Sequence, residues 1–192
     1  MLLVALGLHD AVTLYKALRH RILSRLDTMS GVSSTVKYVL NEKDYDQIML
    51  INPFQVEIVE GIHSILLPYS FTMCQSGFVL LMSKIMSTVT LEMYARASRR
   101  TFTHLGGIKF DGDVRSLLKL FESMNIDAQI IRKYFNKLNR MAYILSMEEL
   151  NDVVESWNEG HILNLTVGEV KKIVSLRVDF VNNNDLDNII LR

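Results

Sequence analysis

The stretch HLGGIKFDGDVRSLLKLF, from His104 to Phe121, contains two adjacent glycines followed closely by two aspartates. A phosphate-binding loop needs several glycines and a Lys-Ser/Thr pair at the start of a helix, and this stretch has no such pair. The pattern instead fits a joint between two helices. Gly106 or Gly107 would end one helix in the left-handed conformation, and Asp111 or Asp113 would cap the next. We therefore expect a structural role for these residues.

Apolar residues recur every three to four positions on both sides of this stretch, a spacing typical of amphipathic helices. Neither an alternating strand pattern nor a repeat of fixed period is visible, so strands and regular solenoids are not expected. The upstream stripes predict helices over residues 8–26, from 54 to the proline at 68 and from 78 to about 105, with 41–46 as a loop. The downstream stripes predict four helices, with apolar residues over 114–124, 130–145, 147–157 and 167–174.

Start signals precede three of the downstream helices. Asp127 can cap one, and Ser146 followed by Glu149 forms a capping box for the next, which ends near Trp157. A second box pairs Thr166 with Glu169, three residues later. Because the connections are short, successive helices should pack antiparallel. The sequence thus predicts an all-α fold that ends in an antiparallel helical bundle.

Composition and charge narrow the classes of function. The 192 residues are 49% apolar and 22% charged, which suits a domain with a packed core. Basic and acidic residues number 21 each, so the chain lacks the basic excess of a nucleic-acid-binding protein. One cysteine, Cys74, cannot form an intrachain disulfide or a cysteine zinc site, and the five histidines have no metal-ligand spacing. We therefore expect no metal, no cofactor and a reducing compartment.

Two apolar segments raise the question of a membrane. The first ten residues are apolar but carry no basic leader, which argues against a signal peptide. Residues 65–84 are interrupted by Pro68 and by several polar side chains, which favours a buried helix broken at the proline over a spanning one. The apolar stripe at the start has no cap, and this suggests a fragment of a longer protein.

Charged residues offer one specific contact. Basic residues group at positions 19–21, 96–100 and 133–140; most such runs are solvated faces, and a minority contact an anionic membrane or an acidic partner. Lys137 lies on the second downstream helix and Glu169 in the first turn of the last. If these helices pack together, the two charges can pair and hold the last helix to the bundle. The alternative is that Glu169 serves only its capping box with Thr166.

Three segments carry a resemblance to a known family. FTHLGGIKFDGDVRSL, IRKYFNKLNRMAYILSMEEL and LTVGEVKKIVSLRVDF resemble, in order and spacing, the C-terminal part of subunit 4 of the conserved oligomeric Golgi complex. The most specific pieces are the LGG-I-x-FD motif and the closing LRVDF, which contains Arg177, Asp179 and Phe180. The resemblance covers residues 93–180 and extends more loosely upstream.

The resemblance implies a non-catalytic subunit of a vesicle-tethering complex that acts in retrograde intra-Golgi transport and Golgi organisation. It implies a helical-rod fold, no cofactor, and a peripheral location on the cytoplasmic face of the Golgi membrane and in the cytosol. Expected partners are other subunits of the complex and, through regions upstream, the fusion machinery; nucleic acid is not expected. The family pairs a basic residue with a glutamate at positions matching Lys137 and Glu169. The family usually has arginine at the first position, and lysine keeps the charge but loses the two-pronged fork.

Two divisions and two rival functions complete the predictions. We expect a partial upstream helical domain over residues 1–62 and a C-terminal bundle over 63–192. One rival is a free-standing cytosolic helical adaptor unrelated to Golgi traffic, which an exposed apolar groove would favour. The other is an enzyme built on a carboxylate metal site in the bundle. Such a site uses two Glu-x-x-His pairs, and the sequence has a single one, Glu60 with His63.

Overall fold

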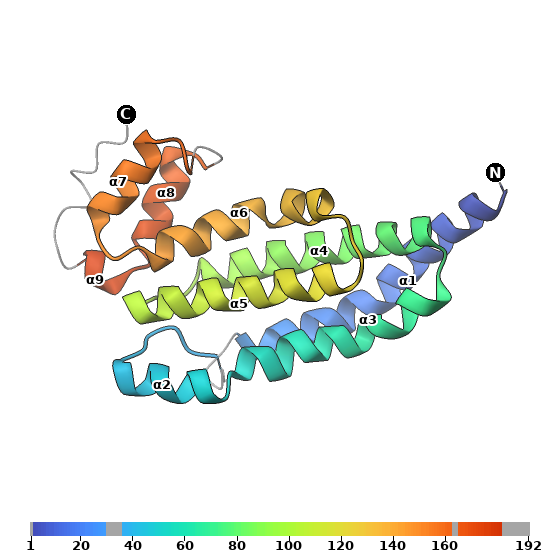
Figure 1. The fold of residues 1–192 in the computed structure, drawn as a ribbon, viewed down its shortest axis with the longest axis horizontal. Helices are drawn as coiled ribbons and strands as arrows, with labels where there is room; N and C mark the ends of the chain where they lie inside the picture. Colours follow the sequence, from blue (N-terminus) through green and yellow to red (C-terminus); the bar gives the residue numbers. More distant parts are fainter. Residues whose placement is uncertain (1, 30–35, 163–164, 182–192) are drawn as a thin grey trace. The chain divides into compact units, whose positions relative to one another are not determined.

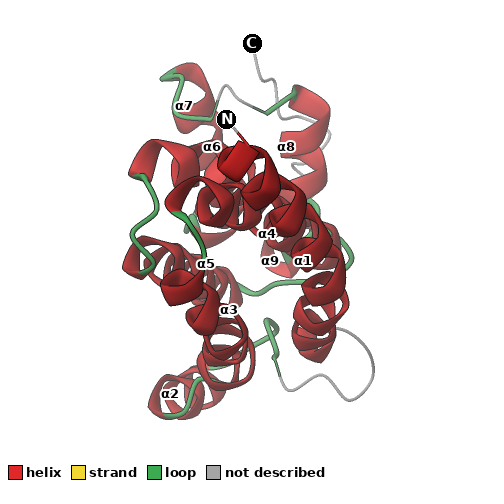
Figure 2. Cartoon of the chain, turned by 90° about the vertical axis from the view of Figure 1, so that its right-hand side faces the viewer, coloured by secondary structure: helices red, strands yellow, loops and turns green. Residues whose placement is uncertain are grey.

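The chain is all-α, as predicted. The computed structural model describes residues 2–29, 36–162 and 165–181. Within these ranges the regular elements are helices (Figures 1 and 2). The one β-type contact among the described residues is an isolated bridge between Phe102 and Arg177. In chain order the elements are α1 (Leu2–Leu26), η1 (Asp27–Met29), α2 (Glu42–Leu50), η2 (Phe54–Val59), α3 (Glu60–Thr72), α4 (Gln75–Ala97), α5 (His104–Ser123), α6 (Ala128–Ser146), α7 (Leu150–Asn158), α8 (Val167–Val174) and α9 (Val178–Val181).

The helices form two compact units. Unit 1 comprises Met1–Val36, Pro53–Met93 and Ser116–Phe135, and unit 2 comprises Lys37–Asn52, Tyr94–Arg115 and Asn136–Arg192. The long helices α4, α5 and α6 each contribute residues to both units. The division predicted at residues 62 and 63 stays a prediction.

Each unit has its own buried core. In unit 1 the rings of Phe121 and Phe135 lie 5.7 Å apart, centre to centre. In unit 2 the rings of Tyr38, Phe102 and Phe110 contact one another at 5.0–5.5 Å, in the offset and edge-on arrangements that aromatic quadrupoles favour. The unit 2 rings belong to the segment before α2, the turn before α5 and α5 itself, so they fix the N-terminal end of α5.

The helix joint predicted at the glycine pair is wrong. Helix α4 ends at Ala97 and α5 begins at His104, so Gly106, Gly107 and Asp111 lie inside α5. The cap is supplied by Thr103, whose hydroxyl oxygen accepts from the Gly106 N–H at 3.3 Å.

Close approach of the backbone explains the glycine pair. A Cβ on Gly106 would lie 1.6 Å from the carbonyl oxygen of Tyr38, and one on Gly107 would lie 1.7 Å from that of Leu145. Both distances are far below van der Waals contact. Among the described glycines, the left-handed conformation occurs at Gly160 (φ 83°), just after the end of α7. The pair therefore lets α5 approach the backbone of Tyr38 and of Leu145 within unit 2. A glycine pair in a sequence does not by itself distinguish this close approach from a left-handed helix end.

Two other boundaries also differ from the prediction. Helix α3 does not break at Pro68 but continues to Thr72. Pro68 and Ser64 are exposed, so water can bond the Ser64 carbonyl that the proline leaves unpaired. Residues 41–46 were predicted as a loop, but α2 begins at Glu42, and the Asn41 side chain caps it by accepting from the Asp44 N–H at 2.9 Å. Helix α2 buries none of its residues, and so it has no apolar stripe to reveal it.

Two of the four predicted caps are confirmed, and the cap expected at Asp111 or Asp113 is wrong because both residues lie inside α5. Asp127 accepts from the Gln129 N–H at 2.7 Å ahead of α6. The box of Thr166 and Glu169 is formed in both directions at the start of α8. The box expected at Ser146 is wrong, because α6 continues to Ser146 and α7 begins at Leu150.

Candidate functional site

A fully buried arginine is the centre of the most tightly bonded cluster in unit 2. Arg177 is 0% exposed. Its Nη1 donates to the carbonyl oxygens of Leu145 and Met147, each at 2.7 Å. Its Nε and Nη2 donate to the two carboxylate oxygens of Asp179, at 2.9 and 2.6 Å. The guanidinium thus closes the C-terminal end of α6, where helix carbonyls lack partners within the helix.

The backbone around Arg177 is held in place by the isolated bridge. The Phe102 N–H donates to the Leu176 carbonyl at 2.8 Å, and the Val178 N–H donates to the Phe102 carbonyl at 3.0 Å. Phe180 places its ring 4.1 Å from the guanidinium carbon, within range of a cation–π contact. The structure therefore brings together the Arg177, Asp179 and Phe180 of the LRVDF motif. We name Arg177, Asp179, Phe180 and the Leu145 and Met147 carbonyls the Arg177 cluster.

The charge state of this cluster follows from its contacts. Partial burial raises the pKa of Asp179, but the hydrogen bonds and the charge of Arg177 outweigh burial and hold that pKa below its ordinary value. Asp179 is 43% exposed while Arg177 is fully buried. A buried guanidinium requires a counter-charge and filled hydrogen bonds, and the carboxylate and the two carbonyls supply both.

Lys137 and Glu169 contact each other, as the sequence suggested they could. The Lys137 ammonium donates to one carboxylate oxygen of Glu169. The other oxygen accepts from the N–H and hydroxyl of Thr166, at 2.9 and 3.1 Å. The ammonium also lies 4.9 Å from the centre of the Tyr94 ring. Glu169 therefore serves both its capping box and the ion pair, so the two alternatives open from the sequence coexist. We name these four residues the Lys137 cluster.

The Lys137 cluster is partly exposed to solvent, but its contacts still shift the pKa values of its members. The hydrogen bond from Lys137, followed by those from Thr166, lowers the pKa of Glu169 to about 2. The hydrogen bond to Glu169 in turn raises the pKa of Lys137. Desolvation raises the pKa of the Tyr94 hydroxyl. The side chains of Lys137 and Glu169 are 50% and 30% exposed, so water screens the attraction between them.

A third cluster was missed by sequence reasoning. Asp113, fully buried on α5, accepts from the Lys109 ammonium at 2.6 Å, the Tyr38 hydroxyl at 2.9 Å and the Asn52 amide at 3.2 Å. The Lys109 ammonium also lies 5.1 Å from the centre of the Tyr38 ring. We name these four residues the Asp113 cluster. Tyr38 precedes α2 and Asn52 follows it. Because both bond to Asp113 on α5, the cluster holds the two ends of the α2 segment against α5.

The sequence did contain a signal for this cluster. Asp113 occupies an apolar-face position of α5, three residues after Phe110 and four before Leu117, both fully buried. Lys109 lies four residues earlier on the same face, at the spacing of a helical ion pair. Burial raises the pKa of Asp113, opposed by Lys109, and burial and the Asp113 charge raise the pKa of Tyr38 well above its usual value. A charged pair inside an apolar stripe was therefore the clue.

The remaining predicted residues have simpler surroundings. Asp111 accepts from Arg115, one turn later on the exposed side of α5, at 2.6 Å. Trp157 is half-buried on α7. Gly106 and Gly107 pack against the backbone carbonyls of Tyr38 and Leu145, and these two neighbours belong to the Asp113 cluster and the Arg177 cluster.

The charged side chains of these clusters bond to one another and to backbone carbonyls. Each charged group described above is held by an internal counter-charge or carbonyl. Among the described residues, no group of three or more His, Cys, Asp or Glu side chains is placed to hold a metal ion. One helix of the described chain, Gln75–Ala97, is long and apolar enough to cross a membrane, and half of its apolar window is buried in the fold. Core helices of soluble proteins have the same properties, so this is weak support for a membrane span.

Comparisons with known proteins give one consistent relationship. Residues 11–172 match the family model described as conserved oligomeric Golgi complex subunit 4, C-terminal. Curated proteins named conserved oligomeric Golgi complex subunit 4 are similar at 26% identity in Dictyostelium discoideum, covering 88% of this chain, and at 25% in Arabidopsis thaliana and Homo sapiens, covering 83% and 76%. The chain covers 18%, 21% and 19% of those three proteins, about a fifth of their length. The chain therefore belongs to the family of the C-terminal part of conserved oligomeric Golgi complex subunit 4.

Proposed function

We propose that this chain is a non-catalytic subunit, or part of one, of a Golgi vesicle-tethering complex. It acts in retrograde intra-Golgi transport and Golgi organisation through protein–protein contacts. The observation that carries the proposal is the family match, which spans residues 11–172. The rival interpretation as a free-standing adaptor is not favoured, since every curated relative named above is a subunit of that complex.

The internal clusters support a mechanical role. The Arg177 cluster joins the end of α6 to the segment after α8, and the Lys137 cluster joins the middle of α6 to the first turn of α8. Polar side chains that are fully satisfied by such contacts stiffen a fold. In this proposal Arg177, Asp179, Phe180, Lys137 and Glu169 keep the C-terminal helices in one arrangement, so that partner surfaces on them are presented rigidly.

The proposal includes partners and a location. Other subunits of the complex bind the chain directly, and the fusion machinery is reached through regions of the assembled subunit beyond this chain. The complex lies peripherally on the cytoplasmic face of the Golgi membrane and exchanges with the cytosol. The division into a partial upstream domain over 1–62 and a C-terminal bundle over 63–192 is also part of the proposal.

Affinity purification tests the proposal directly. The tagged chain, expressed in cells of its own species, should recover the other subunits of the tethering complex, identified by mass spectrometry. The matched control is an unrelated helical protein of similar size with the same tag, which should recover none of them. If the tagged chain recovers no tether subunit at an expression level equal to the control, the proposal is wrong.

A further inference from the structure

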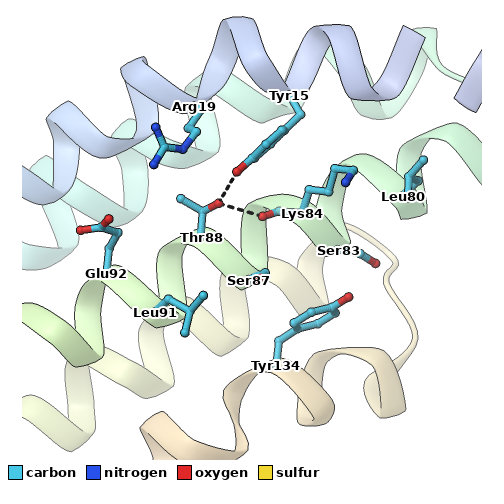
Figure 3. Close-up of a pocket in the computed structure, with 10 residues that line it drawn as sticks. All are labelled: Tyr15, Arg19, Leu80, Ser83, Lys84, Ser87, Thr88, Leu91, Glu92 and Tyr134. Atoms are coloured by element: carbon cyan, nitrogen blue, oxygen red, sulfur yellow. Dashed lines mark hydrogen bonds between the residues drawn. The ribbon is translucent and has the colours of Figure 1, made fainter. Parts of the chain in front are cut away.

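A groove on unit 1 has no role in the clusters above. It encloses about 490 Å³ and is formed by side chains of α1, α4 and α6 (Figure 3). The lining residues are Tyr15, Arg19, Leu80, Ser83, Lys84, Ser87, Thr88, Leu91, Glu92 and Tyr134. Figure 3 shows Tyr15 and Arg19 reaching from α1 along one side and Tyr134 rising from α6 on the other.

The floor of the groove is one face of a single helix. Leu80, Ser83, Ser87 and Leu91 recur on α4 at intervals of three and four residues. At 1.5 Å per residue, this face is about 17 Å long, or roughly three helical turns. Short serine side chains occupy its middle and leucines its two ends, and Leu91 is 66% exposed. A second helix laid along α4 could approach closely over the serines and cover the leucines.

One wall of the groove is held by hydrogen bonds. The Thr88 hydroxyl donates to the Lys84 carbonyl at 3.0 Å. The Tyr15 hydroxyl lies 2.7 Å from the Thr88 oxygen, so Tyr15 is the donor in that contact. The Lys84 ammonium lies 5.8 Å from the centre of the Tyr15 ring. These contacts connect α1 to α4 within unit 1 and fix the Tyr15 ring at the groove's edge, as Figure 3 shows.

The charges of the groove favour an anionic occupant. Arg19 and Lys84 supply two cations, and Glu92 supplies one carboxylate. Arg19 is exposed, and Lys84 is partly exposed, so both can reach an incoming group. The hydroxyls of Ser83, Ser87 and Tyr134 add hydrogen-bond donors beside these cations. Complementary charge of this kind selects partners and orients them as they arrive.

We propose that this groove binds an acidic amphipathic helix of another subunit of the tethering complex. Apolar residues on the incoming helix cover Leu80 and Leu91, small residues pass over Ser83 and Ser87, and carboxylates face Arg19 and Lys84. Only the identity of the partner rests on the proposed function; the chemistry of the occupant rests on the groove. Two cations in a recess that also holds a carboxylate suit a helix better than the flat surface of an anionic membrane.

The first experiment measures the chemistry with defined probes. Two labelled peptides of about 18 residues, long enough to cover the groove, are titrated onto the full chain. They share one apolar face and differ only in flanking glutamates or lysines. We expect the acidic peptide to bind at least about tenfold more tightly than the basic one. Equal affinity of the two peptides, or no binding by either, would overturn the proposal.

Matched variants locate the binding. Arg19→Glu with Lys84→Glu should abolish the preference for the acidic peptide. The control, Lys171→Glu with Lys172→Glu, makes the same charge change at exposed positions of α8 and should leave the preference intact. Ser87→Trp fills the floor without changing charge, and it should weaken binding even if the charge variants prove unstable. Unchanged binding by Ser87→Trp, shown folded by circular dichroism, would place the peptide elsewhere and overturn the proposal.

The second experiment identifies the partner. A photoactivatable residue replaces Ser87 in the tagged chain, and another replaces Phe71, 81% exposed at the end of α3, as a control. We expect the Ser87 position to crosslink to one acidic helical segment of a co-purified subunit, and the Phe71 position not to reach that segment. Two results would overturn the proposal that the groove binds a helix and leave the proposed function standing: crosslinking to phospholipid, or no crosslink at Ser87 while tether subunits co-purify. Selective binding of the acidic peptide without co-purified subunits would support the groove's chemistry and contradict the proposed function.

Discussion

The Arg177 cluster and the Lys137 cluster join the same two regions of unit 2 with opposite exposure. Both connect α6 to α8 or to the residues just after it. Arg177 is 0% exposed, whereas the side chains of Lys137 and Glu169 are 50% and 30% exposed. A buried cation that loses its partners leaves polar groups stranded without water, whereas an exposed pair is replaced by hydration. The comparison teaches that burial, more than hydrogen-bond count, decides how much each cluster contributes to stability.

The largest effect is expected for Arg177→Leu. This change leaves the carbonyls of Leu145 and Met147 buried without their donors and removes the bidentate partner of Asp179. Breaking a buried charge network of this kind costs roughly 3–5 kcal/mol of the free energy of unfolding. Urea denaturation followed by circular dichroism measures it.

Arg177→Lys sharpens the same test. Lysine keeps the charge but has no planar fork to reach two carbonyls and a carboxylate together, so most of the stability should stay lost. The control is Arg115→Leu, which removes an ion pair with Asp111 whose arginine side chain is 71% exposed. That change should cost less than about 1 kcal/mol. A cost at Arg177 no larger than at Arg115 would contradict the argument from burial.

The next largest effect is expected for Asp113→Leu in the Asp113 cluster. The change leaves the Lys109 ammonium, 2% exposed, without its counter-charge, and should cost roughly 3 kcal/mol. Adding Lys109→Met to the same chain should recover much of that loss, because the second change removes the stranded charge. A double-mutant cycle in urea measures the coupling. Additive costs would show that Lys109 and Asp113 do not depend on each other.

The parts of this fold that could be predicted from the sequence depend on residues close to one another along the chain. The box of Thr166 and Glu169 involves residues three apart, and the stripes of the long helices repeat every three to four positions. Long-range contacts explain the failures. Gly106 is a glycine because of the backbone of Tyr38, 68 positions earlier, and nothing within one helical turn of Gly106 encodes that neighbour. The Lys137–Glu169 contact was predicted on the condition that the two helices pack together, and the family resemblance supported it, since spacing alone could not show that α6 and α8 approach each other.

The glycines of α5 give the third prediction, intermediate in size. A Cβ on Gly107 would lie 1.7 Å from the Leu145 carbonyl oxygen, whereas one on Gly112 would meet nothing within 4 Å. Gly107→Ala should therefore force the backbones apart at a cost of about 1–3 kcal/mol, as in overpacked cores. Gly112→Ala should instead stabilise the chain by roughly 0.5–1 kcal/mol, because alanine restricts the unfolded chain and suits a helix.

Thermal unfolding of these two variants separates the two uses of glycine. They share a helix and a substitution and differ only in what surrounds the added methyl group. Gly107→Ala should lower the melting temperature and Gly112→Ala should raise it. Equal shifts would mean that helix propensity, and not close approach, governs both positions, and the explanation given for the glycine pair would then be wrong.

The smallest effect is expected for the Lys137 cluster, where pH reveals it. Contacts with Lys137 and Thr166 lower the pKa of Glu169 from 4.5 to about 2, so the folded state holds the charged carboxylate more strongly than the unfolded state does. This contribution is complete above pH 4.5, is lost as the pH falls toward 2, and amounts to about 0–1 kcal/mol given the exposure of the pair.

Lys137→Met should lower the stability near neutral pH, and its difference from the wild type should narrow as the pH falls through this window. Urea midpoints across the window measure the difference, and Arg115→Met, at an exposed pair on α5, is the matched control. A wild-type advantage over Lys137→Met that persists below pH 2 would show that Lys137 stabilises the chain by packing on Tyr94 and not through the charge of Glu169.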